Sequence, residues 1–156
     1  LAALCQGHGV PLIINDDVTL AARTGAAGVH VGRDDAGLAE ARAALGPEAI
    51  IGVSCYNEPD LASSGHEGGA NYVAFGSFFP SPTKPGAVRA SLELLDFAKK
   101  SLNVPVAGIG GITPHNAPSL IERGADYLAV VTAVFGEDSP DPDAIETNAR
   151  TFAALF

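Results

Sequence analysis

Short apolar runs recur along the chain, and a longer stretch of mixed apolar and polar residues separates each run from the next. The runs lack regularly alternating polar positions, a pattern typical of strands that are buried on both faces of a parallel sheet. Six strands are expected on this basis. They cover residues 12–15, 28–31, 50–53, 72–75, 104–109 and 127–131.

The stretches between these runs are typical of helices, several of which end at Gly or Gly-Pro. Residues 1–9 are expected to contain the end of a helix, and Thr113 is expected to cap a helix that begins at Pro114. The other expected helices cover residues 18–24, 38–45, 58–66, 92–102 and 143–156. Strands alternating with helices indicate an α/β fold, either an open doubly wound sheet or a (β/α)8 barrel.

Three short segments share one local pattern, in which a helix stops at Gly and a strand starts a few residues later. They are residues 25–29, 69–73 and 124–128. Gly is favoured at helix C-termini because it adopts left-handed backbone conformations. The recurrence indicates a repeated strand–helix unit.

The chain is short for one of the two architectures. A (β/α)8 barrel needs eight strands and typically about 250 residues, with about 200 as a lower bound, whereas this chain has 156 residues. The chain also begins in mid-helix. We therefore expect residues 1–156 to form a single domain, the C-terminal six strand–helix units of a TIM barrel, with the first two units missing from this chain.

Charge and cysteine content exclude several functions. The formal net charge is −9, which argues against a nucleic-acid-binding surface. No apolar run approaches the roughly 20 residues that span a bilayer, so no membrane segment is expected, and no secretory signal is visible. Cys5 and Cys55 show neither metal-ligand spacing nor a disulfide framework. This pattern fits the reducing cytoplasm.

Polar residues follow all six expected strands. In a parallel α/β protein the carboxyl ends of the strands meet at one edge, where ligands bind. The residues at these ends are Asn15-Asp16, Gly32-Arg33-Asp34-Asp35, Ser54, the loop 76–84, Gly110-Gly111-Ile112-Thr113 and Val131-Thr132. We therefore expect one ligand-binding edge.

Asp16 and Asp35 follow neighbouring strands, so their carboxylates are expected to share one hard cation. Mg²⁺ is commonly held by one or two protein carboxylates together with phosphate oxygens. The alternative is that each acidic residue only caps the helix that follows it, which is common for Asp.

Phosphate chemistry is expected at the last two strands. Gly110-Gly111 allows the backbone to approach a phosphate, and a short helix after Val131-Thr132 would direct N–H groups at it. A phosphate site at this position recurs in barrels. The alternative is a plain tight turn.

The loop 76–84 is too long for a simple connection. Ser81 and Thr83 supply hydroxyls, and Lys84 supplies a cation on an acidic chain, although a solvated surface lysine is the alternative. His30 lies within a strand and is expected to be a hydrogen-bonded core residue. Cys55 lacks a paired base, so it is not expected to act as a nucleophile.

Five segments in order along the chain together resemble one family. They are Ile13-Ile14-Asn15-Asp16-Asp17, Gly28-Val29-His30-Val31-Gly32 with Asp35, Gly52-Val53-Ser54, Pro80-x-x-Thr83-Lys84 and Gly108-Ile109-Gly110-Gly111-Ile112-Thr113. The chain resembles the thiamine-phosphate synthase family. This resemblance implies a (β/α)8 barrel that joins hydroxymethylpyrimidine diphosphate to thiazole phosphate and releases pyrophosphate.

The resemblance also implies residue roles. Asp16 and Asp35 would bind Mg²⁺. The contacts to the pyrimidine diphosphate would be Asn15, Ser54 and Lys84, of which Lys84 and Ser54 would be catalytic. The contacts to the thiazole phosphate would be Ser81, Thr83, the backbone of Gly111, Val131 and Thr132. The partners are these small molecules, and a homo-oligomer is compatible with the sequence.

Some positions depart from the family pattern. Arg33 stands where the family usually has Gln, Ser77 where Pro is common, and Ser81 where Thr is usual. A Gln-Tyr-Arg-x-Lys segment that grips the diphosphate in the family is absent, and would lie before Leu1. The alternatives are a thiazole tautomerase of the same fold, another phosphate-binding barrel, or an inactive fragment or binding module.

Overall fold

The computed structural model describes residues 1–33, 37–81, 86–136 and 141–156. Six strands form one parallel sheet in which the spatial order follows the sequence, with β1 and β6 at its edges. The strands are β1 Ile13–Asn15, β2 Gly28–Val31, β3 Ile50–Tyr56, β4 Tyr72–Gly76, β5 Val106–Ile109 and β6 Tyr127–Ala129. This order is that of a barrel segment and excludes a doubly wound sheet, whose strand order reverses.

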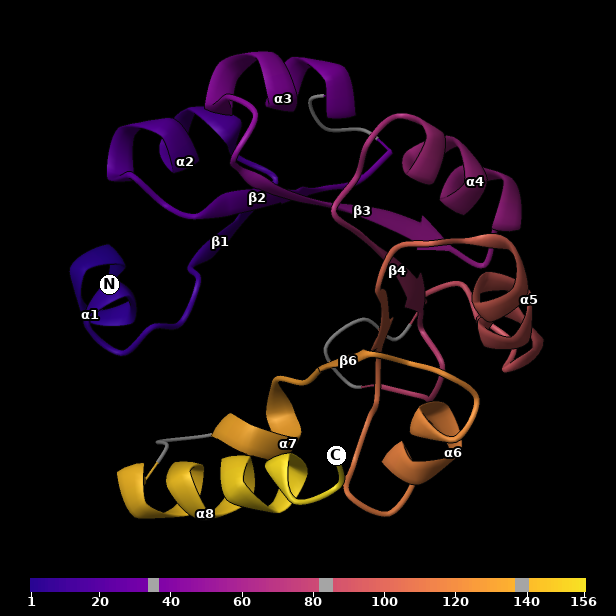
Figure 1. Cartoon of the computed structure of the whole chain (residues 1–156). Coiled ribbons are helices and arrows are strands. Elements are labelled where there is room, and N and C mark those ends of the chain that lie inside the picture. Colours follow the sequence, from indigo (N-terminus) through magenta and orange to yellow (C-terminus); the bar gives the residue numbers. More distant parts are fainter. Residues whose placement is uncertain (34–36, 82–85, 137–140) are drawn as a thin grey trace.

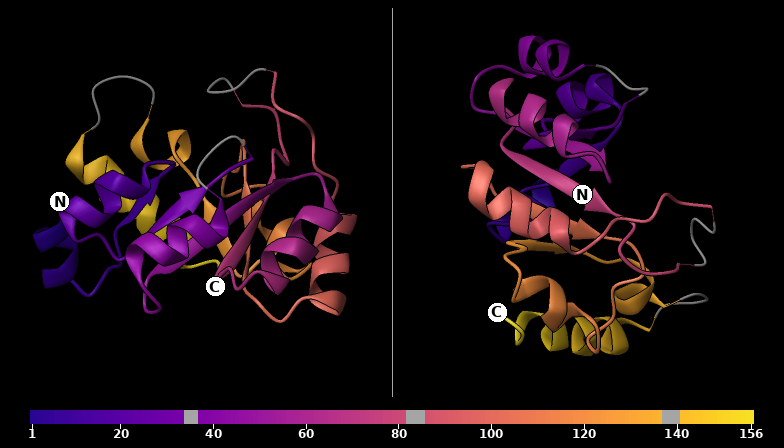
Figure 2. Two further views of the ribbon diagram at one scale, coloured as in Figure 1. Left: turned by 90° about the horizontal axis from the view of Figure 1, so that it is seen from above. Right: turned by 90° about the vertical axis from the view of Figure 1, so that its right-hand side faces the viewer.

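Helices surround the outer side of the curved sheet (Figure 1). Their bounds are α1 Ala2–Gly7, α2 Val18–Thr24, α3 Leu38–Leu45, α4 Pro59–Glu67, α5 Glu93–Ser101, α6 Ala117–Ile121, α7 Thr132–Phe135 and α8 Pro142–Ala153. Helix α8 lies against α7 at the β6 end of the sheet (Figure 2). Within the described ranges, no helix has both the length and the apolar content needed to cross a bilayer.

Local signals explain several element bounds. Helix α2 begins after Asp17, whose carboxylate accepts a hydrogen bond from the Leu20 N–H at 2.8 Å, and it ends at Gly25, which is left-handed. The expected range 18–24 is therefore confirmed. The range 38–45 is confirmed as well.

Several expected bounds were wrong. Strand β5 begins at Val106 rather than at residue 104, β6 ends at Ala129 rather than at residue 131, and α8 ends at Ala153 rather than at residue 156. Helix α6 begins at Ala117 rather than at Pro114, because residues 114–116 form a turn. In that turn the Thr113 N–H donates to Asn116 Oδ1 at 2.8 Å, so Thr113 closes a turn before the helix. Strand β3 continues beyond residue 53 to Tyr56, through a register irregularity against β4 between Ser54 and Tyr56.

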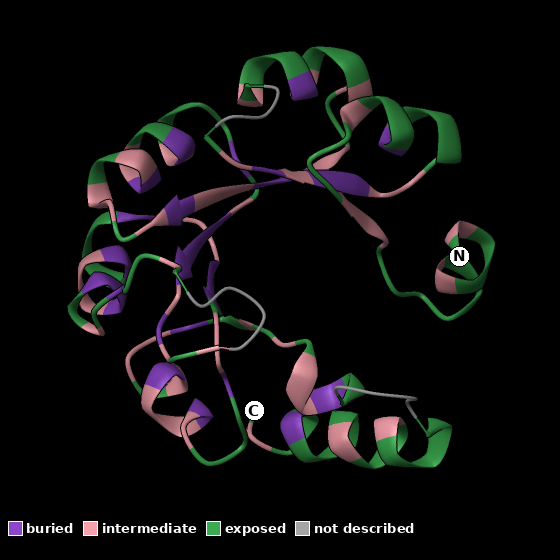
Figure 3. Cartoon of the chain, turned by 180° about the vertical axis from the view of Figure 1, so that it is seen from behind, coloured by how far each residue is buried: buried purple, intermediate pink, exposed green. Residues whose placement is uncertain are grey.

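Two apolar clusters lie between the sheet and its helices (Figure 3). The larger one joins β4 and β5 to α5 and α6, and includes the fully buried side chains of Phe75, Leu95 and Leu120. The smaller one, around Val29 and Ile51, joins β2 and β3 to α2 and α3. The core is therefore deeper on the C-terminal side.

The repeated helix–strand junction has a structural counterpart. Asn71 donates its N–H to the carbonyl of Ile51 and accepts the Ile51 N–H on its side chain, at 2.8 and 2.9 Å. Asp126 makes the same two contacts with Val106, both at 2.8 Å. The first copy of the repeat has Ala27 at this position, which has no side-chain acceptor.

Candidate active site at the carboxyl edge of the sheet

A cavity of about 500 Å³ lies at the carboxyl ends of β3 to β6. Its walls come from the end of β3, the loops after β4 and β5, and the start of α7. Five residues expected at the site line it, namely Ser54, Ser81, Gly111, Val131 and Thr132. The structure thus brings together groups from four strand ends.

The Gly110-Gly111 pair lets two loops come into backbone contact. The Phe78 N–H donates to the Ile109 carbonyl and the Phe79 N–H to the Gly110 carbonyl, both at 3.0 Å. Gly111 has φ +61°, and a Cβ there would collide with the carbonyl groups of Phe79 and Pro80. Only Gly fits this position, so the pair does more than close a tight turn.

The backbone of Gly111 is well placed for an anion. The Gly110 carbonyl accepts the Phe79 N–H at 3.0 Å, which fixes the peptide that carries the Gly111 N–H, and Asn116 Nδ2 fixes the next peptide by donating to the Gly111 carbonyl at 3.1 Å. Among the described residues, no protein group accepts a hydrogen bond from the Gly111 N–H. Gly111 and the first residue of α7, Thr132, line the same cavity, so residues from two loops whose backbone N–H groups are unpaired within the described chain lie at its wall.

A polar network crosses the inner face of the sheet beside the cavity. His30 Nε2 lies 2.8 Å from Ser54 Oγ, and His30 Nδ1 lies 3.0 Å from the Tyr72 hydroxyl. The expected hydrogen-bonded role of His30 is confirmed. Burial raises the pKa of the Tyr72 hydroxyl, so it stays protonated at neutral pH. The network therefore holds the Ser54 hydroxyl at the cavity wall.

Asp16 lies at the end of β1 in a left-handed conformation, with φ 64°. Such backbone in a non-Gly residue costs about 1–3 kcal/mol and clusters at functional sites. Its N–H donates to the His30 carbonyl at 2.8 Å, which ties the β1 end to β2. Because Asp17 provides the cap of α2, the helix-cap alternative is met by Asp17 rather than by Asp16.

The described residues supply only some of the oxygen ligands that a hard cation needs. Asp16 and Asn15 are exposed and supply oxygen ligands. Asp35, Thr83 and Lys84 lie outside the described residues. In the described ranges no group of three or more His, Cys, Asp or Glu side chains could hold a metal. A cation at Asp16 would therefore depend on Asp35 and on substrate oxygens.

The expected site residues fall into two zones. Asn15 and Asp16 do not line the cavity, whereas Ser54 does. His30 connects the zones, because its carbonyl binds Asp16 and its ring binds Ser54. The strand end with Asn15 and Asp16, called the Asp16 zone below, therefore lies next to the cavity zone.

Tyr56 was missed by sequence reasoning, and Ser77 was expected only as part of the loop 76–84. Tyr56 lines the cavity with φ 53°, just after the β3 irregularity, a feature that is common beside active sites. Ser77 also lines it and donates its hydroxyl to the Phe79 carbonyl at 2.7 Å. Only the length of the 76–84 loop signalled Ser77, and ending the strand at residue 53 concealed Tyr56.

Cys55 is fully buried, and burial raises the pKa of its thiol to about 12. The thiol stays protonated at neutral pH and does not face the cavity. This agrees with the expectation that Cys55 is not a nucleophile.

Comparisons with known proteins agree with this geometry. A family model described as thiamine monophosphate synthase matches residues 1–134. A thiamine-phosphate synthase from Thioalkalivibrio sulfidiphilus is 56% identical over 156 residues, which is 100% of this chain and 72% of the relative. One from Azoarcus sp. is 58% identical over 156 residues, 100% of this chain and 73% of the relative.

Solved structures agree on the fold, and one of them also agrees with the relatives in its name. A thiamine phosphate pyrophosphorylase from Pyrococcus furiosus superposes with a TM-score of 0.84 and 30% identity, covering 99% of this chain and 73% of that one. An orotidine 5'-phosphate decarboxylase from Pyrococcus horikoshii shares the fold alone, with a TM-score of 0.64 and 17% identity, over 97% of this chain and 78% of that one. The chain belongs to the thiamine-phosphate synthase family.

Proposed function

We propose that this chain joins hydroxymethylpyrimidine diphosphate to thiazole phosphate and releases pyrophosphate, as a transferase of thiamine biosynthesis. The observation that carries this assignment is the shared cavity of Ser54, Ser81, Gly111 and Thr132, next to the strand end that bears Asp16. Two anionic substrates need two neighbouring anion sites, which the two zones would supply.

The thiazole phosphate would lie at the Gly111 side of the cavity. The Gly111 N–H and the first N–H groups of α7 would bind its oxygens, and the hydroxyls of Ser81 and Thr83 would add contacts. Val131 would hold the start of α7 in place. Fixing the phosphate at one end aligns the thiazole nitrogen with the pyrimidine.

The pyrimidine diphosphate would lie between Ser54 and the β1 end. His30 orients the Ser54 hydroxyl toward the cavity, and Asn15 and Lys84 would add contacts. When bound, Mg²⁺ would neutralise charge on the diphosphate leaving group, and Asp16 and Asp35 would hold it. Little proton transfer is needed, because the aminopyrimidine ring donates electrons to the carbon left behind. Lys84 and Ser54 would stabilise developing charge.

We further propose that residues 1–156 form one domain and the last six units of an eight-stranded barrel. The in-order parallel sheet with helices on its outer side supports this, as does the greater length of the relatives. The two free cysteines fit the cytoplasm. Gel filtration of the full-length protein would test whether it is a homo-oligomer.

Asp16→Asn in the full-length protein tests the proposed reaction. We expect turnover to fall by roughly two orders of magnitude, comparable with removing a charge-stabilising group, and the Mg²⁺ requirement to rise. Asp17→Asn is the matched control, because Asn caps a helix as well as Asp does. An unchanged rate and Mg²⁺ dependence in Asp16→Asn would contradict the assignment. A thiazole tautomerase would instead show isomerisation that does not depend on Mg²⁺.

A further inference from the structure

Arg33 makes a set of contacts that the proposed reaction does not use. Its guanidinium forms an ion pair with Glu58 and lies over the Tyr56 ring, 5.2 Å from the ring centroid. The backbone N–H of Arg33 donates to the Tyr56 hydroxyl at 3.4 Å. These contacts join the loop after β2 to the loop after β3.

The contacts place Arg33 at the rim of the cavity. Tyr56 lines the cavity and follows the wall residue Ser54 by two positions. Arg33 itself follows β2, the strand that pairs with the β1 strand bearing Asp16. The guanidinium is therefore held on the Tyr56 ring and, in strand order, lies between the Asp16 zone and the cavity zone.

The ion pair of Arg33 with Glu58 is weak enough for a bound anion to replace Glu58. The Arg33 and Glu58 side chains are 52% and 47% exposed, and an ion pair this exposed contributes little to stability. A diphosphate offers more charge and a geometry that matches the guanidinium fork. The chain has a net charge of −9, so a cation at this rim reduces the electrostatic repulsion of an anionic substrate.

We propose that Arg33 is a further substrate-binding residue, whose guanidinium exchanges Glu58 for the diphosphate while it stays on the Tyr56 ring. This inference rests on the proposed function. It assigns a role to the position where the resemblance marks a departure, and it supplies a cation where Gln would supply a neutral amide.

The test measures the affinity of the full-length protein for inorganic pyrophosphate with Mg²⁺, by isothermal titration calorimetry. We expect Arg33→Gln to raise the Kd roughly tenfold, the effect of losing one charge-assisted contact at an exposed site. Glu58→Gln removes the competitor and is expected to lower the Kd roughly threefold. The two variants break the same ion pair, so opposite effects on affinity distinguish substrate binding from a structural link.

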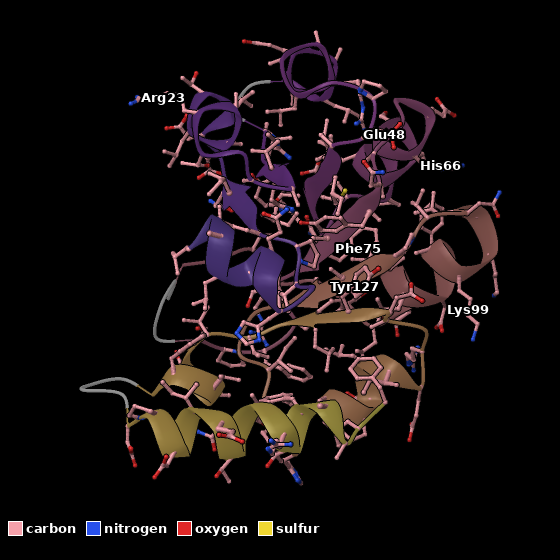
Figure 4. All side chains as sticks on the ribbon, turned by 60° about the vertical axis from the view of Figure 1, so that its left-hand side comes forward. Arg23, Glu48, His66, Phe75, Lys99 and Tyr127 are labelled. Carbon is pink, nitrogen blue, oxygen red and sulfur yellow. The ribbon has the colours of Figure 1, made fainter. Side chains whose placement is uncertain are left out.

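Arg23→Gln is the control for charge. Arg23 lies in the last turn of α2 and points to the outside of the molecule (Figure 4), and its loss removes the same charge from the chain. An Arg33→Gln effect no larger than that of Arg23→Gln would overturn the inference, as would equal effects of Arg33→Gln and Glu58→Gln.

Asp16→Asn distinguishes a failure of the Arg33 role from a failure of the proposed function. If Asp16→Asn weakens pyrophosphate binding and Arg33→Gln does not, only the role of Arg33 is wrong. If the unmodified protein does not bind pyrophosphate with Mg²⁺, both the inference and the proposed function fail.

Discussion

The N-terminal and C-terminal sides of the sheet, meaning its β1–β3 half and its β4–β6 half, are packed differently. On the C-terminal side, large side chains such as Phe75, Leu95 and Leu120 form a deep cluster behind the cavity. On the N-terminal side, the cluster around Val29 and Ile51 is smaller, and β1 is a short edge strand. The densely packed side bears the cavity, and the lightly packed side bears Asp16 and Arg33. Elements that move on ligand binding are drawn from the less stable parts of a fold, which suits the proposed exchange by Arg33.

The largest expected effect is at the deep cluster. Phe75→Ala should lower the free energy of unfolding by about 3–5 kcal/mol, because it removes a fully buried ring and leaves a cavity. Ile51→Val in the smaller cluster should cost only about 0.5–1.5 kcal/mol. Urea denaturation of both variants of the full-length protein measures this contrast. Equal losses would mean that the two sides are packed alike.

The two cysteines give a pH-dependent contrast between the sides. Burial raises the Cys55 pKa from 9.0 to about 12, so the unfolded state loses this proton first. The contribution to stability is complete below pH 9 and is lost as pH rises toward 12. At pH 10 the loss is on the order of 1 kcal/mol.

Cys55→Ala should remove this slope in stability between pH 9 and pH 12, as measured by urea denaturation across that range. Cys5, which is partly exposed in α1, should react with iodoacetamide in the folded protein while Cys55 does not. An unchanged slope in Cys55→Ala would show that other groups cause the decline.

A smaller effect is expected at the repeated junction. Asn71→Ala should cost about 1 kcal/mol, because it leaves the Ile51 N–H without its side-chain acceptor. Asp126→Ala should behave alike at Val106. Thermal denaturation of each variant measures the loss, and Asp126→Asn, which keeps an acceptor, should recover most of it.

The smallest expected effect is a gain in stability on the N-terminal side of the sheet. Ala27→Asn would add to the β1–β2 junction the side-chain acceptor that the other two copies have, and a gain of roughly 0.5 kcal/mol is expected. Thermal denaturation against the parent protein measures it. A loss instead of a gain would indicate that packing, rather than the missing acceptor, limits the N-terminal side.

Local patterns were enough for the sheet and for part of the site. Uninterrupted apolar runs predicted all six strands, and Asp17 with Gly25 predicted the bounds of α2. Polar residues after the strands predicted that Ser54 and Gly111 would share one edge, because parallel strands end on the same side. The start of α6 was mispredicted, since Asn116 competes with Pro114 as the signal for a helix start.

The sequence by itself determined the parallel α/β architecture and the residue types at the ligand-binding edge, because these depend on periodicity and on residues close in the chain. It also carries the motifs by which the chain resembles its family. Only the tertiary structure decided that His30 binds Ser54, that Tyr56 joins the cavity wall and that Arg33 pairs with Glu58. Each of these contacts joins different strands or loops. Their geometry depends on strand register and on the β3 irregularity, which no local pattern encodes.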